Sequence, residues 1–390
     1  MRLRPAADVG SRYPAPVVVH GATLGPLLAA GHPAAIACQA DTPGHALTHW
    51  RSDGTAGCVQ RLDVHPMTGD PASASIVAGV AVYAGPLLDH FGHMLAEFIH
   101  RLWAVTAFPA LGDATVVFQI HPGQARPAWL DPVTAMCGID PARVLLVDRP
   151  TRFETLHVPE QGRVLGGEVL IPDYPALFPL VPLDAPPEGA SRRLYVSRSR
   201  HIHSGSFLGE SLGERVLATA GYEIVHPQEW PIRALVARLA AADSLIFSEG
   251  SAIHLLELCG PVTAPILLIG RRGATDLRFG RLLRSLTPAL TVFPGRRATV
   301  CLDWERGGDT PRRGRGCSFV DLAGLIAALA AFTGMTLPVP DADERRAAIG
   351  SDLLRFLLDP MAGVSSTDQQ LGRALRAIRD DPEIAALIAP

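Results

Sequence analysis

The chain has 390 residues, of which 48% are hydrophobic and 19% are charged, so it can bury a large core and is not expected to be disordered as a whole. Its formal net charge of −3 lacks the basic excess of a nucleic-acid-binding protein. The sequence contains no lysine and no asparagine, which excludes Walker-A phosphate loops, lysine Schiff bases and Cys-His-Asn triads.

The six cysteines are scattered, and none of them forms a CxxC pair, so we predict neither a disulfide scaffold nor a zinc ribbon. The amino-terminal segment lacks the apolar stretch of a signal peptide, and no window reaches 18 uninterrupted apolar residues. We therefore expect a reduced, cytoplasmic protein without a transmembrane segment, for which peripheral association with a membrane is possible.

The first half of the chain predicts an irregular segment to about residue 70 and then an α/β layer. Its clearest helix pattern covers Gly92–Phe108. Apolar runs indicate four strands, at Ile76–Tyr83, Thr115–Ile120, Arg143–Val147 and Glu168–Ile171. Four prolines and a glycine in Pro179–Arg192 disfavour regular structure, so this stretch is interpreted as a linker between domains.

After the linker, short apolar runs alternate with amphipathic ones. Strands are predicted at Arg193–Ser197, Tyr222–Val225, Leu245–Ser248, Ile266–Ile269 and Leu290–Phe293. Helices are predicted at Gly209–Ala220, Pro231–Ala242, Ser251–Cys259 and Thr275–Leu286. This alternation predicts a parallel, doubly wound sheet, which binds ligands at the carboxyl ends of its strands. After the last of these strands the chain reads as helical, at Phe319–Phe332, Asp343–Leu358 and Asp368–Asp380.

The densest group of titratable residues lies at Gly85–Trp103. His93 and Glu97 are four residues apart and therefore share one helix face, and His90 at the helix entry could point the same way. A histidine one turn from a glutamate suits a general base and its orienting partner, and the sequence leaves open which of the two is the base. A buried polar helix end, with Glu97 satisfying His93, explains the pattern equally simply. One HxxxE pair is weak evidence for zinc, and we predict no metal site.

A second candidate site is the turn Glu249-Gly250-Ser251, which joins a predicted strand to a predicted helix. Free backbone N–H groups at such a turn bind diphosphates without lysine. The alternative is an ordinary turn in which Ser251 caps the helix. Glu257, near the end of that helix, could accept a hydrogen bond from a sugar hydroxyl or simply face solvent.

Arginines form the third candidate site. Residues 191–315 carry 18 arginines against 11 acids, whereas both flanking segments are acidic. Arg198 and Arg200 follow one predicted strand and Arg272 follows another, so these side chains could clamp phosphate oxygens. A solvated basic surface is the competing interpretation. Asp341 and Asp343 spell DxD, but their place before a helix favours N-capping over a metal–nucleotide site.

Several segments resemble conserved blocks of glycosyltransferase family 61, whose members include bacterial capsular-polysaccharide proteins. The resemblance covers residues 85–105 and 193–260, and the blocks occur in the family's order. The segments are GHMLAEFIHRLWAV, YVSRSR, GERVLATAGYEIVHPQEW and AADSLIFSEGSAIHLLELCG. Gly213 stands where the family usually has asparagine before the kept Glu214, and Glu249 stands where it usually has histidine.

The resemblance implies an α/β protein of the GT-B type, with two Rossmann-like domains facing across a cleft. On this basis we assign residues 1–184 to an acceptor-side domain, 191–333 to a nucleotide-sugar-binding domain and 334–390 to a helical tail. The implied activity is inverting, metal-independent transfer from a nucleotide-sugar donor to a glycan or polysaccharide acceptor, with no cofactor. The implied donor site contains Arg198, Arg200, Glu214, Glu249, Gly250, Ser251 and Arg272, and the implied catalytic residues are His90, His93 and Glu97.

Two alternatives remain. A catalytically inactive relative that binds glycan or scaffolds an assembly would be consistent with the changes at Gly213 and Glu249. A dehydrogenase with a Rossmann domain is disfavoured, because no GxGxxG motif follows a strand.

Overall fold

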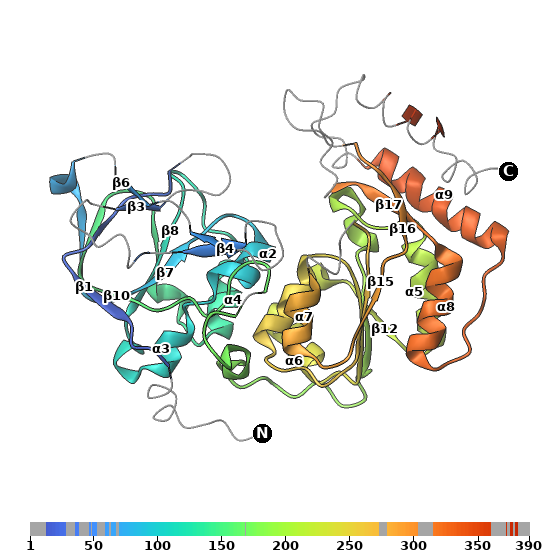
Figure 1. Cartoon of the computed structure of the whole chain (residues 1–390), viewed down its shortest axis with the longest axis horizontal. Helices are drawn as coiled ribbons and strands as arrows, with labels where there is room; N and C mark the ends of the chain where they lie inside the picture. Colours follow the sequence, from blue (N-terminus) through green and yellow to red (C-terminus); the bar gives the residue numbers. More distant parts are fainter. Residues whose placement is uncertain are drawn as a thin grey trace. The chain divides into compact units, whose positions relative to one another are not determined.

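The computed structural model describes residues 13–28, 36–38, 47, 49–52, 59–61, 64–67, 70–167, 169–272, 279–302 and 315–359, with a few further helical residues between 372 and 380. The chain divides into two compact units (Figure 1). Unit 1 consists of residues 1–184 and 254–261, and unit 2 consists of residues 185–253 and 262–390. The domain limits that we inferred from the sequence stay predictions.

Unit 1 is built on an eight-stranded mixed sheet. Its order is β6-β3-β2-β10-β7-β8-β9, and β1 also pairs with β10. The strands are β1 (Val17–His20), β2 (Thr23–Leu24), β3 (Ile36–Cys38), β6 (Val64–Pro66), β7 (Ser75–Pro86), β8 (Thr115–Gln119), β9 (Val144–Val147) and β10 (Thr151–Val158). Strands β10, β7, β8 and β9 run parallel, whereas β1 and β2 pair with β10 in the antiparallel sense. A separate pair is formed by β4 (Trp50–Ser52) and β5 (Val59–Arg61).

Short helices connect these strands. They are η1 (Pro71–Ser73), α2 (Phe91–His93), η2 (Met94–Phe98), α3 (Trp103–Ala107), η3 (Pro109–Leu111), α4 (Leu130–Met136), η4 (Pro141–Arg143) and η5 (Tyr174–Leu177). The continuous helix predicted at Gly92–Phe108 is wrong, because α2, the π-helical turn η2 and α3 divide it. The strand predicted at Glu168–Ile171 is also wrong: Val169 makes only an isolated bridge to Arg163, and residue 168 lies outside the described residues.

Unit 2 contains a five-stranded sheet in the order β12-β11-β13-β14-β15, and every neighbouring pair is parallel. The strands are β11 (Arg193–Val196), β12 (Glu223–Val225), β13 (Ser244–Ser248), β14 (Ile266–Ile269) and β15 (Leu290–Phe293). The first crossover runs from β11 to β12 and the next returns from β12 to β13, so the chain changes direction beside β11. The predicted parallel sheet is therefore confirmed, with all five strands within a residue or so of their expected places.

Helices cover both faces of this sheet, with α6 and α7 on one face and α5, α8 and α9 on the other (Figure 1). The helices are η6 (Ser199–Ser204), α5 (Glu210–Thr219), η7 (Pro227–Glu229), α6 (Ile232–Ala240), η8 (Ser251–Leu258, whose last residues belong to unit 1), α7 (Arg281–Leu286), α8 (Leu322–Thr333) and α9 (Ala342–Leu358). Apolar residues of β11, β13 and β14 pack against α5, α8 and α9 in one core. Part of the helix predicted at Thr275–Leu286 lies outside the described residues.

The carboxyl-terminal part begins with an antiparallel pair, β16 (Arg296–Val300) and β17 (Cys317–Val320). The helix predicted from Phe319 therefore starts too early, and Asp321 caps α8 by accepting from the N–H of Gly324 at 2.9 Å. Asp341 caps α9 and exchanges hydrogen bonds with Glu344 in a capping box. The capping interpretation of the DxD sequence is thus confirmed.

These two sheets confirm the α/β class. The GT-B arrangement of two Rossmann-like domains stays a prediction, because unit 1 holds a mixed sheet rather than the doubly wound sheet found in unit 2. Within the described part of the chain, no helix has both the length and the apolar character needed to cross a membrane.

Candidate active site

The first site in unit 1 lies beyond the carboxyl end of β7. His90 begins α2 as its N-cap, and its Nδ1 accepts from the backbone N–H of His93 at 3.2 Å. The π-helical turn η2 follows, in which the N–H of Ile99 donates to the carbonyl of Met94 at 3.1 Å. All five residues of η2 are buried, including Glu97. Such π-turns are often found at functional sites, because the extra residue redirects side chains inside a helix.

The buried carboxylate of Glu97 is the centre of this site. Only 1% of its side chain is exposed. Its Oε2 lies 2.9 Å from His93 Nδ1, and its Oε1 lies 3.0 Å from His49 Nε2 and 2.6 Å from Arg51 Nε. One carboxylate is therefore surrounded by two imidazoles and a guanidinium, a set that strongly favours its ionised form.

His49 and Arg101 form a second layer behind Glu97. Arg101 donates from Nη1 to His49 Nδ1 at 3.0 Å and from Nε to the carbonyl of Pro159 at 2.9 Å. Burial lowers the pKa of His49 to about 4, so the ring is neutral near pH 7. A neutral His49 that accepts at Nδ1 carries its proton on Nε2, from which it donates to Glu97. The chain Arg101–His49–Glu97 is thus consistent in every donor and acceptor.

The ionised state of Glu97 determines the proton position on His93. Burial alone would raise the pKa of Glu97, but hydrogen bonds from His49 and His93 and the charge of Arg51 bring it to about 2. His93 therefore donates from Nδ1 to the carboxylate, and its Nε2 is the basic nitrogen. Arg51 Nη2 also lies 3.3 Å from Nδ1, but a nitrogen that donates to Glu97 cannot accept there, and the contact with the carboxylate is shorter.

A second buried carboxylate in unit 1, Glu257, is surrounded in the same way. His254 Nδ1 lies 2.8 Å from its Oε1, and His100 Nε2 and Arg163 Nη1 each lie 3.1 Å from its Oε2. These hydrogen bonds overcome the effect of burial and hold the pKa of Glu257 below its usual range. The sequence-based suggestion that Glu257 faces solvent is therefore wrong. Within the described residues, no three His, Cys, Asp or Glu side chains are arranged to hold one metal ion.

Unit 2 brings three arginines together at the carboxyl edge of its sheet. Arg198 follows β11, and Arg271 and Arg272 follow β14. Burial first, and then the charges of Arg198 and Arg272, lower the pKa of Arg271 to about 9. Burial and the charge of Arg272 also lower the pKa of Arg198. Each cation thus lies within electrostatic range of the other two, which is costly without an anion.

Glu249, at the end of β13, provides part of the compensating charge. Its buried carboxylate accepts from Arg272 Nε at 2.5 Å and from the backbone N–H groups of Arg271 and Arg272 at 3.0 Å each. Arg271 Nε in turn donates to the carbonyl of Glu249 at 2.9 Å. Glu249, which stands where the resembled family usually has histidine, therefore joins the ends of β13 and β14 and fixes the direction of Arg272.

Arg198 lies directly against Gly250. A Cβ atom added to Gly250 would lie 2.3 Å from Arg198 Nη1, so only glycine leaves room for this guanidinium. Arg198 also donates from Nε to the carbonyl of Gly205 at 2.9 Å and from Nη2 to that of Ser204 at 3.1 Å. The next residue, Ser251, is the first residue of η8, which is a 3₁₀ rather than an α-helix.

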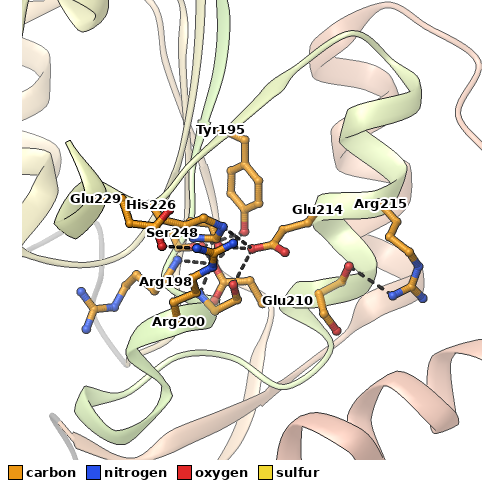
Figure 2. Close-up of polar contacts among 12 residues, drawn as sticks. Tyr195, Arg198, Arg200, Glu210, Glu214, Arg215, His226, Glu229 and Ser248 are labelled. Carbon is orange, nitrogen blue, oxygen red and sulfur yellow. Dashed lines mark hydrogen bonds and ion pairs between the residues drawn. The ribbon is translucent and has the colours of Figure 1, made fainter. Parts of the chain in front are cut away.

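Two other residues predicted for the donor site, Arg200 and Glu214, lie outside this group of contacts. Arg200 is 55% exposed and forms an ion pair with the exposed Glu229. Glu214 accepts at 2.5 Å from each of the hydroxyls of Ser197 and Ser199, and His226 Nε2 lies 4.0 Å from it (Figure 2). The structure thus brings Arg198, Arg272, Glu249 and Gly250 together, whereas Arg200 is an exposed residue paired with Glu229.

Sequence reasoning missed the residues that complete both sites. His49 and Arg51 reach Glu97 from more than forty positions earlier in the chain, and no spacing rule connects them with a helix at residue 93. Arg271 begins the basic segment 271–284 that contains Arg272, but the sequence does not single it out as a donor-site residue.

Unit 2 thus presents a parallel sheet with arginines at its carboxyl edge, and unit 1 contains a buried histidine–carboxylate pair. Residues 91–265 match the model of the family described as Glycosyltransferase 61. This match supports glycosyltransferase family 61 for this part of the chain, and the resemblance seen in the sequence is confirmed. No curated protein matches the chain.

Proposed function

We propose that this glycosyltransferase transfers a sugar from a nucleotide-sugar donor to a glycan or polysaccharide acceptor, with inversion and without a metal ion. The observation that carries the proposal is the group of Arg198, Arg271 and Arg272 at the carboxyl edge of the parallel sheet in unit 2. Three neighbouring guanidinium groups suit the two phosphates of a nucleotide-sugar. We further propose a cytoplasmic enzyme with a surface polysaccharide as its acceptor.

The arginines bind the diphosphate and stabilise its departure. When the bond between the anomeric carbon and the diphosphate oxygen breaks, negative charge accumulates on the β-phosphate. Arg198 and Arg272 are fixed beforehand by Gly205 and Glu249, so they meet this charge with little reorganisation. Fixed guanidinium groups thereby supply the positive charge that a metal ion supplies in other glycosyltransferases.

His93 is the general base of the proposed reaction. Its Nε2 accepts the proton of the acceptor hydroxyl while the hydroxyl oxygen forms the new bond to the anomeric carbon. Glu97 stays ionised and stabilises the resulting imidazolium through Nδ1. The exposure of the two side chains supports this order of roles, since 19% of His93 but only 1% of Glu97 is exposed. The proposal therefore assigns Glu97 the role of orienting His93, whereas the sequence is compatible with either residue as the base.

Calorimetry tests the donor site directly. The protein is titrated with UDP, GDP, CDP and ADP, each with and without EDTA, and we expect at least one to bind equally well under both conditions. Binding that requires a divalent ion would refute the metal-independent part of the proposal. No binding of any nucleoside diphosphate would refute the donor site itself.

A second candidate function is binding without catalysis. The observation that favours it is the ion pair between Glu249 and Arg272, because it neutralises part of the charge that a diphosphate would meet. Incubation of the protein with the matching nucleotide-sugars separates the two functions. An enzyme releases free nucleoside diphosphate by transfer or slow hydrolysis, whereas an inactive relative leaves every nucleotide-sugar intact.

A further inference from the structure

The carboxylate of Glu210, at the first position of α5, is the most heavily hydrogen-bonded acidic group in the polar cluster of Figure 2. It is fully buried. Its Oε1 accepts from Tyr195 Oη at 2.9 Å, from Ser197 Oγ at 3.1 Å and from the backbone N–H of Arg198 at 2.8 Å. Ser248 and Ser206 also donate to this carboxylate, through their hydroxyls.

These donors come from two different strands. Tyr195 lies in β11 and Ser197 directly follows it, whereas Ser248 is the last residue of β13. Tyr195 Oη also lies 2.9 Å from Ser248 Oγ. One carboxylate therefore joins the ends of the two strands between which the chain reverses direction, where ligands of doubly wound sheets bind.

The same carboxylate fixes the starting point of the Arg198 side chain. The backbone N–H of Arg198 donates to it, and the guanidinium then passes over Gly250, two residues beyond Ser248. Glu210 thus holds both residues of this contact: Arg198 through the end of β11, and Gly250 through Ser248 at the end of β13. A shift of either strand end by a fraction of an ångström would change the space available to the guanidinium.

We propose that Glu210 is a positioning residue for the donor diphosphate: it acts through Arg198 and Gly250 and does not itself touch the ligand. This inference rests on the proposed function of the arginine group in unit 2. Nothing in the sequence signals this role, because the hydroxyls of β11, β13 and the 197–206 loop meet Glu210 only after folding.

The charge of Glu210 and its hydrogen bonds make opposite contributions to anion binding. Its negative charge repels a diphosphate. If Glu210 affects binding only through this charge, removal of the charge should tighten diphosphate binding. A positioning role predicts weaker binding when the hydrogen bonds are removed. Glu210→Gln removes the charge and keeps an acceptor oxygen for Tyr195, Ser197, Arg198 and Ser248. Glu210→Ala removes both the charge and the hydrogen bonds.

Inorganic pyrophosphate, the part common to all nucleoside diphosphates, is the probe, and calorimetry on the full chain gives its Kd. We expect Glu210→Ala to raise this Kd about tenfold, as for the loss of one charge-assisted contact. Glu210→Gln should stay within about threefold of the wild type. The double variant Ser197→Ala/Ser248→Ala removes one hydroxyl donor at the end of each strand and keeps the hydrogen bonds from Tyr195 and from the N–H of Arg198. It should also raise the Kd, by less than Glu210→Ala does, and it tests the inference even if Glu210→Ala does not fold.

Asp352→Asn is the matched control. Asp352 is a buried carboxylate on α9 that accepts from the N–H of Gly209 at 2.9 Å, so it joins the start of α5 to α9 and not to the strand ends. Its loss should lower the melting temperature and leave the pyrophosphate Kd unchanged. Arg215→Ala, on the exposed side of α5, should change neither quantity.

The outcomes of these binding experiments distinguish the donor site from the role of Glu210. A wild-type protein that does not bind pyrophosphate overturns the donor site, and the inference about Glu210 with it. Wild-type binding together with an unchanged Kd in both Glu210→Ala and the double serine variant overturns the inference alone. Tighter binding by Glu210→Gln would assign Glu210 a charge role instead. Equal loss of affinity in Asp352→Asn and Glu210→Ala would show that the effect is general destabilisation.

Discussion

Glu97 and His93 are joined by a 2.9 Å contact between Oε2 and Nδ1, yet the two side chains differ in their access to solvent. Glu97 is buried among His49, Arg51 and His93, whereas about a fifth of the His93 side chain is exposed. This difference in exposure supports the roles that we propose for the two residues, which a spacing of four residues cannot distinguish. The accessible ring can meet a substrate, and the buried carboxylate can only act through that ring.

His93→Ala should therefore lower turnover about 10²–10⁴-fold, because the acceptor hydroxyl loses its base. The affinity for nucleoside diphosphate should not change, since the arginines that we assign to it lie in unit 2. Turnover, diphosphate Kd and melting temperature are measured on the same preparations. Full activity in a stable His93→Ala protein would remove this histidine from the mechanism.

Glu97→Gln and His65→Ala serve as comparisons for this variant. Glu97→Gln should lower turnover as well, because the imidazolium loses its buried counter-charge, and it should also destabilise the fold by leaving Arg51 uncompensated. His65→Ala, at an exposed position in β6, should leave turnover and melting temperature unchanged. The loss in His93→Ala should thus exceed any loss that its melting temperature explains.

The buried His49 should make the stability of the protein depend on pH. Burial lowers its pKa from 6.5 to about 4 in the folded state, so the unfolded chain binds a proton in this interval that the folded chain does not bind. The free energy of unfolding should therefore fall as the pH decreases from about 6.5 to about 4. A shift of this size corresponds to roughly 3 kcal/mol.

Chemical denaturation at pH values between 4 and 8 measures this dependence, with His49→Gln as the test variant. The variant should be less stable than the wild type at pH 8 and should lose less stability on acidification. Some dependence should persist, because burial also lowers the pKa of His100. Parallel curves for the two proteins across this range would refute the assignment to His49.

The sequence predicts the sheet of unit 2 well, because each strand is recognisable from its own residues and those next to it. Each of its five strands is a short apolar run between turn residues, and a parallel strand buried on both faces needs no partner-specific signal. Unit 1 is less predictable, because Thr151–Val158 has only three apolar residues, Phe153, Leu156 and Val158, yet forms the central strand β10. Its pairing partners β2 and β7 lie far away in the chain.

The candidate sites show the same division. The pair His93–Glu97 follows from helical spacing, although the intervening residues form a π-turn rather than an α-helix. The capping role of Asp341 likewise follows from neighbours three residues apart. The contacts of His49 with Glu97, and of Ser248 with Glu210, join segments 48 and 38 residues apart, and no local pattern encodes them. The sequence therefore indicates the residues with chemically reactive side chains, but not the residues from distant segments that hydrogen-bond to them.

The sequence predicts that Arg198 and Arg200 both bind the donor, but their contacts predict different results for their variants. Arg198→Ala should weaken nucleoside diphosphate binding roughly tenfold to a hundredfold, as expected for a charge-assisted contact. Arg200→Ala should change it less than about threefold, because an exposed guanidinium paired with Glu229 is well screened. Calorimetry on both variants decides the matter. Equal losses of diphosphate affinity in the two variants would show that Arg200 also contributes to donor binding.

Gly250→Ala tests the position of Arg198 without touching its charge. The added methyl group would lie 2.3 Å from Arg198 Nη1 and 2.7 Å from its Cδ, so the side chain must leave its present place. The backbone of Gly250 does not need the left-handed conformation, and the cost of the variant is therefore the displaced arginine rather than backbone strain. We expect a loss of diphosphate affinity similar to that of Arg198→Ala, together with a small change in melting temperature.

Gly213→Ala is the control for the Gly250 variant. A Cβ at Gly213 would meet no atom within 4 Å, and Gly213 lies inside helix α5. Alanine there should stabilise the protein by about 0.5–1 kcal/mol, because it restricts the unfolded chain and favours the helix. Its diphosphate affinity should equal that of the wild type. If Gly250→Ala binds diphosphate as tightly as Gly213→Ala does, the Arg198 guanidinium does not act from its place over Gly250, and the donor must be held by Arg271 and Arg272 alone.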